Sequence, residues 1–187
     1  MKKIIWNIRP IGLPLVLRHC KKCGKKAEFI CSGQFRVNAQ RKYLDIWLIY
    51  KCTKCDTTWN AEVYSRVSPQ ALNANLLEGF YSNEEGLARQ YAMDFQFLKG
   101  NGADVLRPSC SVLGDIPASG EVSEVEIQSE YPFPVKVSTL VRDKLCLSQK
   151  DYLERVTEGK IRSSAGQDLR KCRLKNGTTI KIGRAHV

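Results

Sequence analysis

Two cysteine motifs, Cys20-Lys21-Lys22-Cys23-Gly24 and Cys52-Thr53-Lys54-Cys55-Asp56, decide the fold of the N-terminal part of this chain. The 28 residues from Gly24 to Lys51 are enough for a strand pair that runs out and back and brings the motifs together. Four thiolates held by two such turns suit one structural Zn²⁺ and leave no coordination position open for catalysis. The motifs therefore predict a zinc ribbon with Cys20, Cys23, Cys52 and Cys55 as ligands.

Other interpretations of the cysteines are weaker. A redox Cys-x-x-Cys pair usually occurs singly near a βαβ pattern, which is absent here, and disulfides are rare in a reducing compartment. His19 lies next to Cys20 and could replace one ligand, but the fourth cysteine makes this unnecessary. The remaining cysteines have no partner at metal-ligand spacing and are interpreted as small buried hydrophobic residues. They are Cys31, Cys110, Cys146 and Cys172.

The net charge of +11 is distributed unevenly over the 187 residues. Residues 1–66 carry 14 basic and 4 acidic side chains, residues 67–134 carry 3 and 10, and residues 135–187 carry 13 and 5. Two basic ends around an acidic middle predict two modules that contact a polyanion, with nucleic acid as the expected partner. The alternative is that both ends are only solvated charged faces.

The N-terminus resembles a signal peptide only over its first six residues. Asn7, Arg9, Pro10 and Pro14 interrupt the apolar run, and no small-residue cleavage site follows. The sequence also has no apolar stretch long enough for a transmembrane helix, so we expect a cytoplasmic protein without a membrane partner.

Alternating apolar residues predict three strands, at residues 29–37, 43–51 and 57–64. With the cysteine motifs they would form a zinc-ribbon domain of residues 1–66. So small a sheet buries little apolar surface, and we therefore expect the metal to contribute to its folding.

Residues 67–120 are expected to form a helical pair and a loop that pack on the ribbon. Ser68-Pro69 is typical of a helix start, and Ser82 with Glu85 has the form of a capping box before a second helix that would end at Gly100. The loop that follows is rich in glycine, serine and proline.

Residues 121–187 are expected to form a separate C-terminal module. A strand, two short helices and a late strand pair with Asn176-Gly177 as its turn are predicted there. Ser148 would cap the second helix, and Gly159 would end it. The expected fold class is therefore α+β: a three-stranded zinc ribbon, a helical connector and a small α+β module.

This C-terminal module resembles the small αL-type RNA-binding fold of a small-subunit ribosomal protein, many pseudouridine synthases and tyrosyl-tRNA synthetase tails. Ser148, Gly159 and Ile161 match its spacing, while Gln149 stands where a basic residue usually follows the serine. The resemblance implies RNA binding by this basic region. The candidate contacts are Lys150, Arg155, Lys160, Arg162, Arg170, Lys171 and Arg173.

The chain as a whole is similar to a bacterial family known only as a domain of unknown function (number 1062). The similarity is carried by segments around both cysteine motifs and the strands between them, which include residues 18–24, 29–32, 35–39, 45–52 and 57–60. It implies the architecture and no activity.

The last six residues, Ile182–Val187, read like a widely used short-read sequencing adapter translated in frame and followed by a stop. We therefore expect an assembly artefact, with a different natural continuation after Lys181, and give Arg184 and His186 no functional weight.

No catalytic constellation is present in the sequence, because phosphate-loop, dinucleotide-binding and metalloprotease motifs are all absent. The main hypothesis is a non-enzymatic protein with one structural zinc that binds RNA through basic faces, although DNA is not distinguished from RNA. Tyr43, Tyr64 or Trp47 would stack on bases or serve as ordinary strand residues. The alternative is a zinc-ribbon adaptor with a protein partner; no small-molecule substrate is evident.

Overall fold

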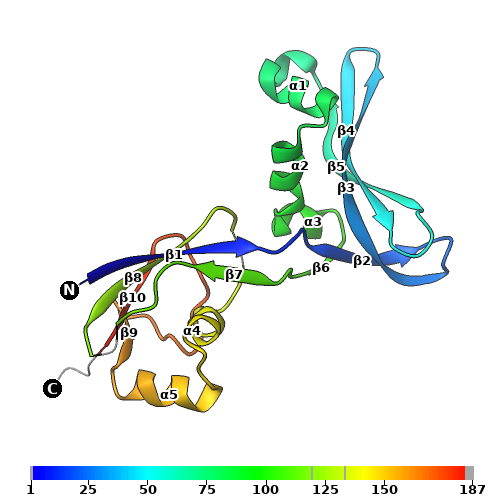
Figure 1. The fold of residues 1–187 in the computed structure, drawn as a ribbon. Coiled ribbons are helices and arrows are strands. Elements are labelled where there is room, and N and C mark those ends of the chain that lie inside the picture. The colour runs from blue at the N-terminus through cyan, green and yellow to red at the C-terminus, as the bar shows by residue number, and fades with distance from the viewer. Residues whose placement is uncertain (1, 119, 133, 184–187) are drawn as a thin grey trace. The chain divides into compact units, whose positions relative to one another are not determined.

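A computed structural model describes residues 2–118, 120–132 and 134–183 (Figure 1). Most of the suspected artefact, residues 184–187 with Arg184 and His186, lies outside the described residues. The chain forms two compact units. We call Gly12–Pro108, which contains both cysteine motifs, the knuckle unit. The described residues before and after it together form the split unit.

The expected α+β fold, with its three-stranded ribbon and helical connector, is wrong. The structure is 42% strand and 24% helix, and its described residues contain two five-stranded sheets. Short alternating segments flanking the predicted ones also form strands, so each sheet is larger than the sequence pattern suggested. No described helix has the length and apolar character needed to cross a membrane.

The sheet of the knuckle unit is entirely antiparallel, with strand order β5-β4-β3-β2-β6. The three expected ribbon strands are present as β3, β4 and β5, and β2 and β6 extend the sheet beyond β3. A bulge between Cys31 and Phe35 interrupts the β3–β4 register. The strands are β2 (Leu15–Cys20), β3 (Lys25–Gln40), β4 (Tyr43–Cys52), β5 (Thr58–Val67) and β6 (Asp104–Leu106).

Short helices cover one face of this sheet (Figure 1). They are the 3-10 turn η1 (Pro69–Ala71), α1 (Ala74–Ser82), α2 (Glu85–Ala92) and α3 (Phe95–Gly100). The Ser68-Pro69 start gives only η1, and the expected second helix is divided at Asp94, whose carboxylate caps α3. Ser82 ends α1 and caps nothing, because its hydroxyl donates to the Glu78 carbonyl.

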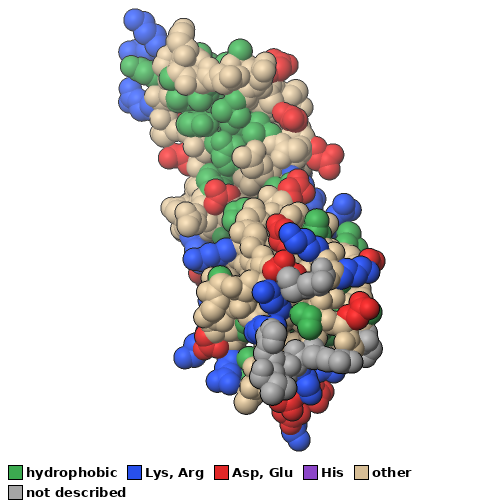
Figure 2. Space-filling view, turned by 90° about the vertical axis from the view of Figure 1, so that its left-hand side faces the viewer, with side chains coloured by type: hydrophobic (Ala, Val, Ile, Leu, Met, Phe, Trp, Pro, Cys, Tyr) green, Lys and Arg blue, Asp and Glu red, His purple; other side chains and the backbone are tan. Residues whose placement is uncertain are grey.

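The knuckle unit has a substantial apolar core between this sheet and these helices. Phe35, Phe80 and Tyr91 meet edge to face or tilted, with ring centroids 4.9–6.0 Å apart. Hydrophobic side chains are visible on the helical side in the upper part of Figure 2. The sheet therefore does not rely on metal alone for burial.

The split unit joins the two ends of the chain in one sheet of order β7-β1-β8-β10-β9. β1 runs parallel to β8, and the other pairs are antiparallel. Residues 2–10, expected in the ribbon domain, thus pair with C-terminal strands instead. The elements are β1 (Lys2–Pro10), β7 (Cys110–Leu113), β8 (Ser123–Ser129), α4 (Val137–Leu145), α5 (Gln149–Thr157), β9 (Ile161–Ser163) and β10 (Thr178–Ile182).

Period-two burial explains the core of the split unit. Ile4, Trp6 and Ile8 of β1 are buried, while the residues between them are exposed. Trp6 is fully buried, and its indole Nε1 donates a 2.8 Å hydrogen bond to the Asp115 carbonyl. Close to it, Gly114 has φ +130°, and a Cβ there would lie 2.2 Å from the Ile5 carbonyl oxygen, so only glycine fits.

Candidate metal centre and basic surface

The two cysteine motifs, residues 20–24 and 52–56, are named the knuckles. They lie at the same end of the sheet, because the first connects β2 to β3 and the second connects β4 to β5. Each closes through the same backbone contact: the Gly24 amide donates to the Cys20 carbonyl at 2.9 Å, and the Asp56 amide donates to the Cys52 carbonyl at 3.0 Å. Gly24 and Asp56 both have positive φ, 67° and 56°. This repeated turn aims the cysteine side chains toward one point.

The four sulfur atoms are close enough to share a metal ion. Cys20 Sγ lies 3.5 Å from Cys55 Sγ, Cys23 Sγ lies 3.9 Å from Cys52 Sγ, and all four lie within 4.8 Å of one another. Tetrahedral thiolates around Zn²⁺ would be about 3.8 Å apart, given a Zn–S bond of about 2.3 Å. A disulfide requires about 2.05 Å, so these distances fit a metal and not two cystines. The predicted cluster is therefore formed, and it could hold a metal ion.

The cluster connects the core to the surface. Cys20 and Cys52 are buried and belong to the apolar core, whereas Cys23 and Cys55 are partly exposed. Hydrogen bonding by Thr57, whose hydroxyl lies 3.2 Å from the Cys55 sulfur, lowers the pKa of Cys55 to about 6. The neighbouring Cys55 and burial raise the pKa of Cys23 to about 12. Without a metal ion, the four cysteines would not all be ionised at neutral pH. A bound cation would replace the thiol protons and stabilise all four thiolates.

Residues near the cluster have different roles from those that the sequence suggested. His19 is exposed and does not join the four cysteines among the described residues. Thr57 was missed, although it stands only two positions after a predicted ligand. Arg18 was also missed: its guanidinium lies 4.4 Å from the Trp59 ring centroid and donates to the Asn101 carbonyl. Through these two contacts Arg18 links β2, the strand before the first knuckle, to Trp59 and Asn101.

The other cysteines are scattered. Cys31, Cys110 and Cys172 are partly buried, but Cys146 is exposed, so its expected burial is wrong. Cys146 ends α4 with φ 52°, a position that faces solvent. Desolvation by burial raises the pKa of Cys31, Cys110 and Cys172, which makes these thiols poor nucleophiles.

Exposed lysines surround the knuckles. A divalent metal ion with four thiolates would carry a net charge of about −2. The positive charge of the five lysines is more than enough to balance it. One of them, Lys26, forms an ion pair with Asp104. The five are Lys21, Lys22, Lys25, Lys26 and Lys54.

The basic residues predicted to contact nucleic acid lie on the surface of the split unit. Arg162 is partly buried, and the other six are exposed. Arg155 and Lys160 come together at a groove of about 440 Å³ whose lining includes Leu145 and Ile161. Arg162 donates to the Gly159 carbonyl at 3.0 Å, and Arg170 donates to the Thr157 hydroxyl at 3.2 Å. The structure therefore groups some of these residues and does not form one continuous basic strip.

Acidic neighbours reduce the charge of this surface. Lys150 lies 4.0 Å from Glu154, and Lys160 lies 2.6 Å from Glu158. Basic and acidic side chains are mixed in the lower part of Figure 2. Such exposed ion pairs contribute little free energy, so a competing anion can displace them at small cost.

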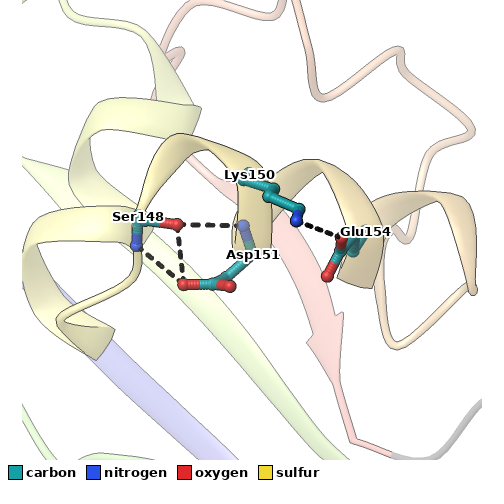
Figure 3. A network of polar contacts seen from close by, with 4 residues as sticks. All are labelled: Ser148, Lys150, Asp151 and Glu154. Carbon is teal, nitrogen blue, oxygen red and sulfur yellow. Dashed lines mark hydrogen bonds and ion pairs between the residues drawn. The ribbon is translucent and has the colours of Figure 1, made fainter.

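The start of α5 has the local structure that the sequence predicted (Figure 3). The Ser148 hydroxyl accepts from the Asp151 amide at 3.1 Å, and the Ser148 amide donates to the Asp151 carboxylate at 3.3 Å, which completes a capping box. The same hydroxyl also donates to the Asp151 carboxylate at 2.7 Å. Gly159 follows the helix with φ 71°, and Ile161 is buried in β9.

Comparison with known proteins identifies the family but no activity. The model of a family described as "Protein of unknown function (DUF1062)" matches residues 37–167, which include the second knuckle and α5. This is more than half of the chain, so the protein belongs to that family. No curated protein and no solved structure gave a match.

Proposed function

We propose that the four cysteines hold one structural Zn²⁺. Zinc favours four thiolates in tetrahedral geometry and has no redox chemistry, so it suits this donor set. The supporting observation is the spacing of the four sulfur atoms, all within 4.8 Å of one another. A bound ion would cross-link the β2–β3 turn to the β4–β5 turn, and with four protein ligands it would have no position open for a substrate.

We further propose that the protein binds RNA through basic faces and catalyses no reaction. The observation that carries this proposal is the groove where Arg155 and Lys160 lie beside the apolar residues Ile116, which is 62% exposed, and Leu145. One acid, Glu121, also lines this groove. Proteins that recognise unpaired RNA combine cations for the phosphates with an apolar or aromatic surface for the bases. The groove has both components. Lysines around the knuckles would offer a second, weaker phosphate contact.

A charge reversal at this groove tests RNA binding. The double variant Arg155→Glu, Lys160→Glu should weaken binding of a labelled single-stranded RNA oligonucleotide at low salt. It should also flatten the log–log salt dependence by about 1.4, because about 0.7 is contributed for each of two phosphates. Fluorescence anisotropy over a salt series measures both effects.

A matched control separates groove binding from net charge. Lys2→Glu, Lys3→Glu reverses two exposed lysines on β1 of the same unit and changes the net charge equally. It should weaken binding much less. If both double variants lose the same amount of RNA affinity, the effect comes from net charge and not from the groove. A wild-type protein that binds no RNA at low salt would contradict the proposal and favour the adaptor hypothesis.

A further inference from the structure

One face of the knuckle-unit sheet is apolar but has no cover from its own unit, all of whose residues are described. The helices α1–α3 stand on the opposite face (Figure 1). Six large apolar side chains lie on the uncovered face, and none of them packs on the core cluster. Ile30 and Leu106 are 48% and 36% exposed. The six are Leu15, Leu17, Ile30, Trp47, Ile49 and Leu106.

Strand register makes these side chains one continuous patch. Leu15 pairs with Leu106 of β6, and the Val16–Phe29 pair places Leu15 beside Ile30. Ile30 pairs with Lys51, from which Ile49 is the next residue on the same face of β4. Trp47 follows Ile49 in the same alternation. Ile30 and Leu106 are exposed, and the other four side chains are partly buried. A partly exposed apolar patch on a sheet face is typical of a protein interface.

Trp47 stands between two opposite charges. It pairs with Arg36 on one neighbouring strand, β3, and with Glu62 on the other, β5. Both side chains are exposed, and no ion pair joins either of them to another described residue. Since neighbouring strands are about 4.8 Å apart, Arg36 and Glu62 are separated by about 10 Å across the indole.

This distribution favours a second copy of the chain over a polyanion. The face has no excess of positive charge, because its four acids, Glu28, Asp45, Glu62 and Asp104, outnumber its three bases, Lys26, Arg36 and Lys51. A two-fold axis along β4 would place the β3 side of one sheet over the β5 side of the other. Arg36 would then face Glu62 of the partner subunit, and the reverse pair would form by symmetry. Asp45 and Lys51, which share this face of β4, would each lie near their own copy, a like-charge cost that the Trp47 contact and the two ion pairs must exceed. Packed sheets lie about 10 Å apart, a gap that an arginine and a glutamate can bridge together.

We propose that this uncovered face forms a two-fold interface between two copies of the protein. Trp47 packs on Trp47 of the partner subunit at its centre, and two Arg36–Glu62 ion pairs flank it. The apolar side chains of β2, β3 and β6 extend the contact to one side. The proposal is independent of RNA binding and concerns a surface outside the Arg155–Lys160 groove.

Charge-swap variants of the full-length, metal-loaded protein test the interface. Sedimentation equilibrium without RNA should show a concentration-dependent dimer. Arg36→Glu should weaken dimerisation at least about tenfold, because it places like charges opposite each other twice. Adding Glu62→Arg in the same chain should restore the wild-type constant, since the pairs re-form with reversed sign. Trp47→Glu should weaken dimerisation by about thirtyfold or more.

Controls keep the test decisive. Arg41→Glu, in the turn after β3, should leave the mass unchanged, and circular dichroism should show that every variant is folded. A wild-type monomer at all concentrations would overturn the proposal. So would a dimer that neither Arg36→Glu nor Trp47→Glu weakens. Loss of RNA binding in Trp47→Glu with unchanged mass would overturn it too and would assign the face to nucleic acid.

Discussion

The two units of this protein build sheets of equal strand number by opposite means. The knuckle unit is one continuous segment, and each cysteine knuckle closes a turn between neighbouring strands. The split unit pairs β1 with β8 in parallel, starting with Lys2 opposite Ser123, so its sheet joins residues far apart in sequence. One unit thus joins two local turns at a cysteine cluster that could hold a metal ion. The other depends on apolar burial between the two ends of the chain.

The cysteine cluster of the knuckle unit adjoins an apolar core and does not replace one. Cys20 and Cys52 belong to the same buried cluster as Phe29, Leu48 and Phe80. The expectation that this sheet buries little apolar surface is therefore wrong, while a metal contribution to folding stays a prediction. Loss of metal should open the knuckle end first and weaken the remainder of the unit.

The largest expected effect follows from loss of a metal ligand, which should destabilise the knuckle unit and leave the split unit unchanged. Cys52→Ser should remove the one bound zinc and lower the Tm of the knuckle unit by about 10 °C or more, because a ligand that binds only the folded state stabilises it. Hydrogen exchange should accelerate at residues 21–24 and 53–57, while β1 and β8 should stay protected. Metal analysis and exchange mass spectrometry measure both effects.

Cys146→Ser is the control for this prediction, because that thiol is exposed in the split unit and has no role in the cluster. It should change neither the metal content nor the Tm. The comparison between the units would be wrong if Cys52→Ser kept one zinc per chain, or if β1 and β8 lost protection as fast as the knuckles.

A core truncation should break the other unit. Trp6→Ala removes a fully buried indole and its hydrogen bond to Asp115, and should lower the free energy of unfolding of the split unit by about 3–5 kcal/mol. The zinc content should not change. Ile5→Ala, one residue away and 50% exposed on the opposite face of β1, is the matched control and should have little effect. Denaturant unfolding with zinc analysis compares the two variants. Equal losses of unfolding free energy would show that the buried and exposed faces of β1 do not differ in their contribution to stability.

Local patterns account for what the sequence predicted well. The strands expected at residues 29–37 and 43–51 occur within β3 and β4, and the one expected at 57–64 matches β5 except for Thr57, because alternation and turn signals act within a few residues. The four cysteines meet because the β3–β4 strand pair between the two motifs runs out and back and returns the second motif to the first. The Ser148 cap also depends only on its own turn.

Long-range pairing accounts for what was missed. Ile4, Trp6 and Ile8 do alternate, but nothing near them in sequence indicates that their partners begin at Ser123. The expected second helix is divided at Asp94, because its carboxylate accepts hydrogen bonds from the first amides of α3 and so favours a new helix start over a continuous helix. The Arg155–Lys160 groove could not be seen in the sequence either, since Leu145 and Ile161 enter it from different elements.

The smallest expected effect concerns the cap of α5, which distinguishes local from long-range stabilisation inside the split unit. Hydrogen bonds from Ser148 hold the pKa of the Asp151 carboxyl below its ordinary value of 3.8. Because the folded-state pKa is depressed, this contribution to stability is fully present above the ordinary, unfolded pKa of 3.8 and is lost as pH falls through the folded pKa. Ser148→Ala should cost about 1 kcal/mol at neutral pH.

The pH dependence gives this last prediction its test. The stability difference between wild type and Asp151→Asn, measured by urea unfolding, should be largest at neutral pH and should shrink in acid, where the wild-type carboxylate also becomes neutral. Glu154→Gln on the same helix is the control, because Glu154 makes only a 4.0 Å contact with Lys150 and caps nothing. A difference that stayed constant into acid would mean that Asp151 acts by shape alone. Zinc content should be unaffected throughout, since the capping box and the cysteines belong to different units.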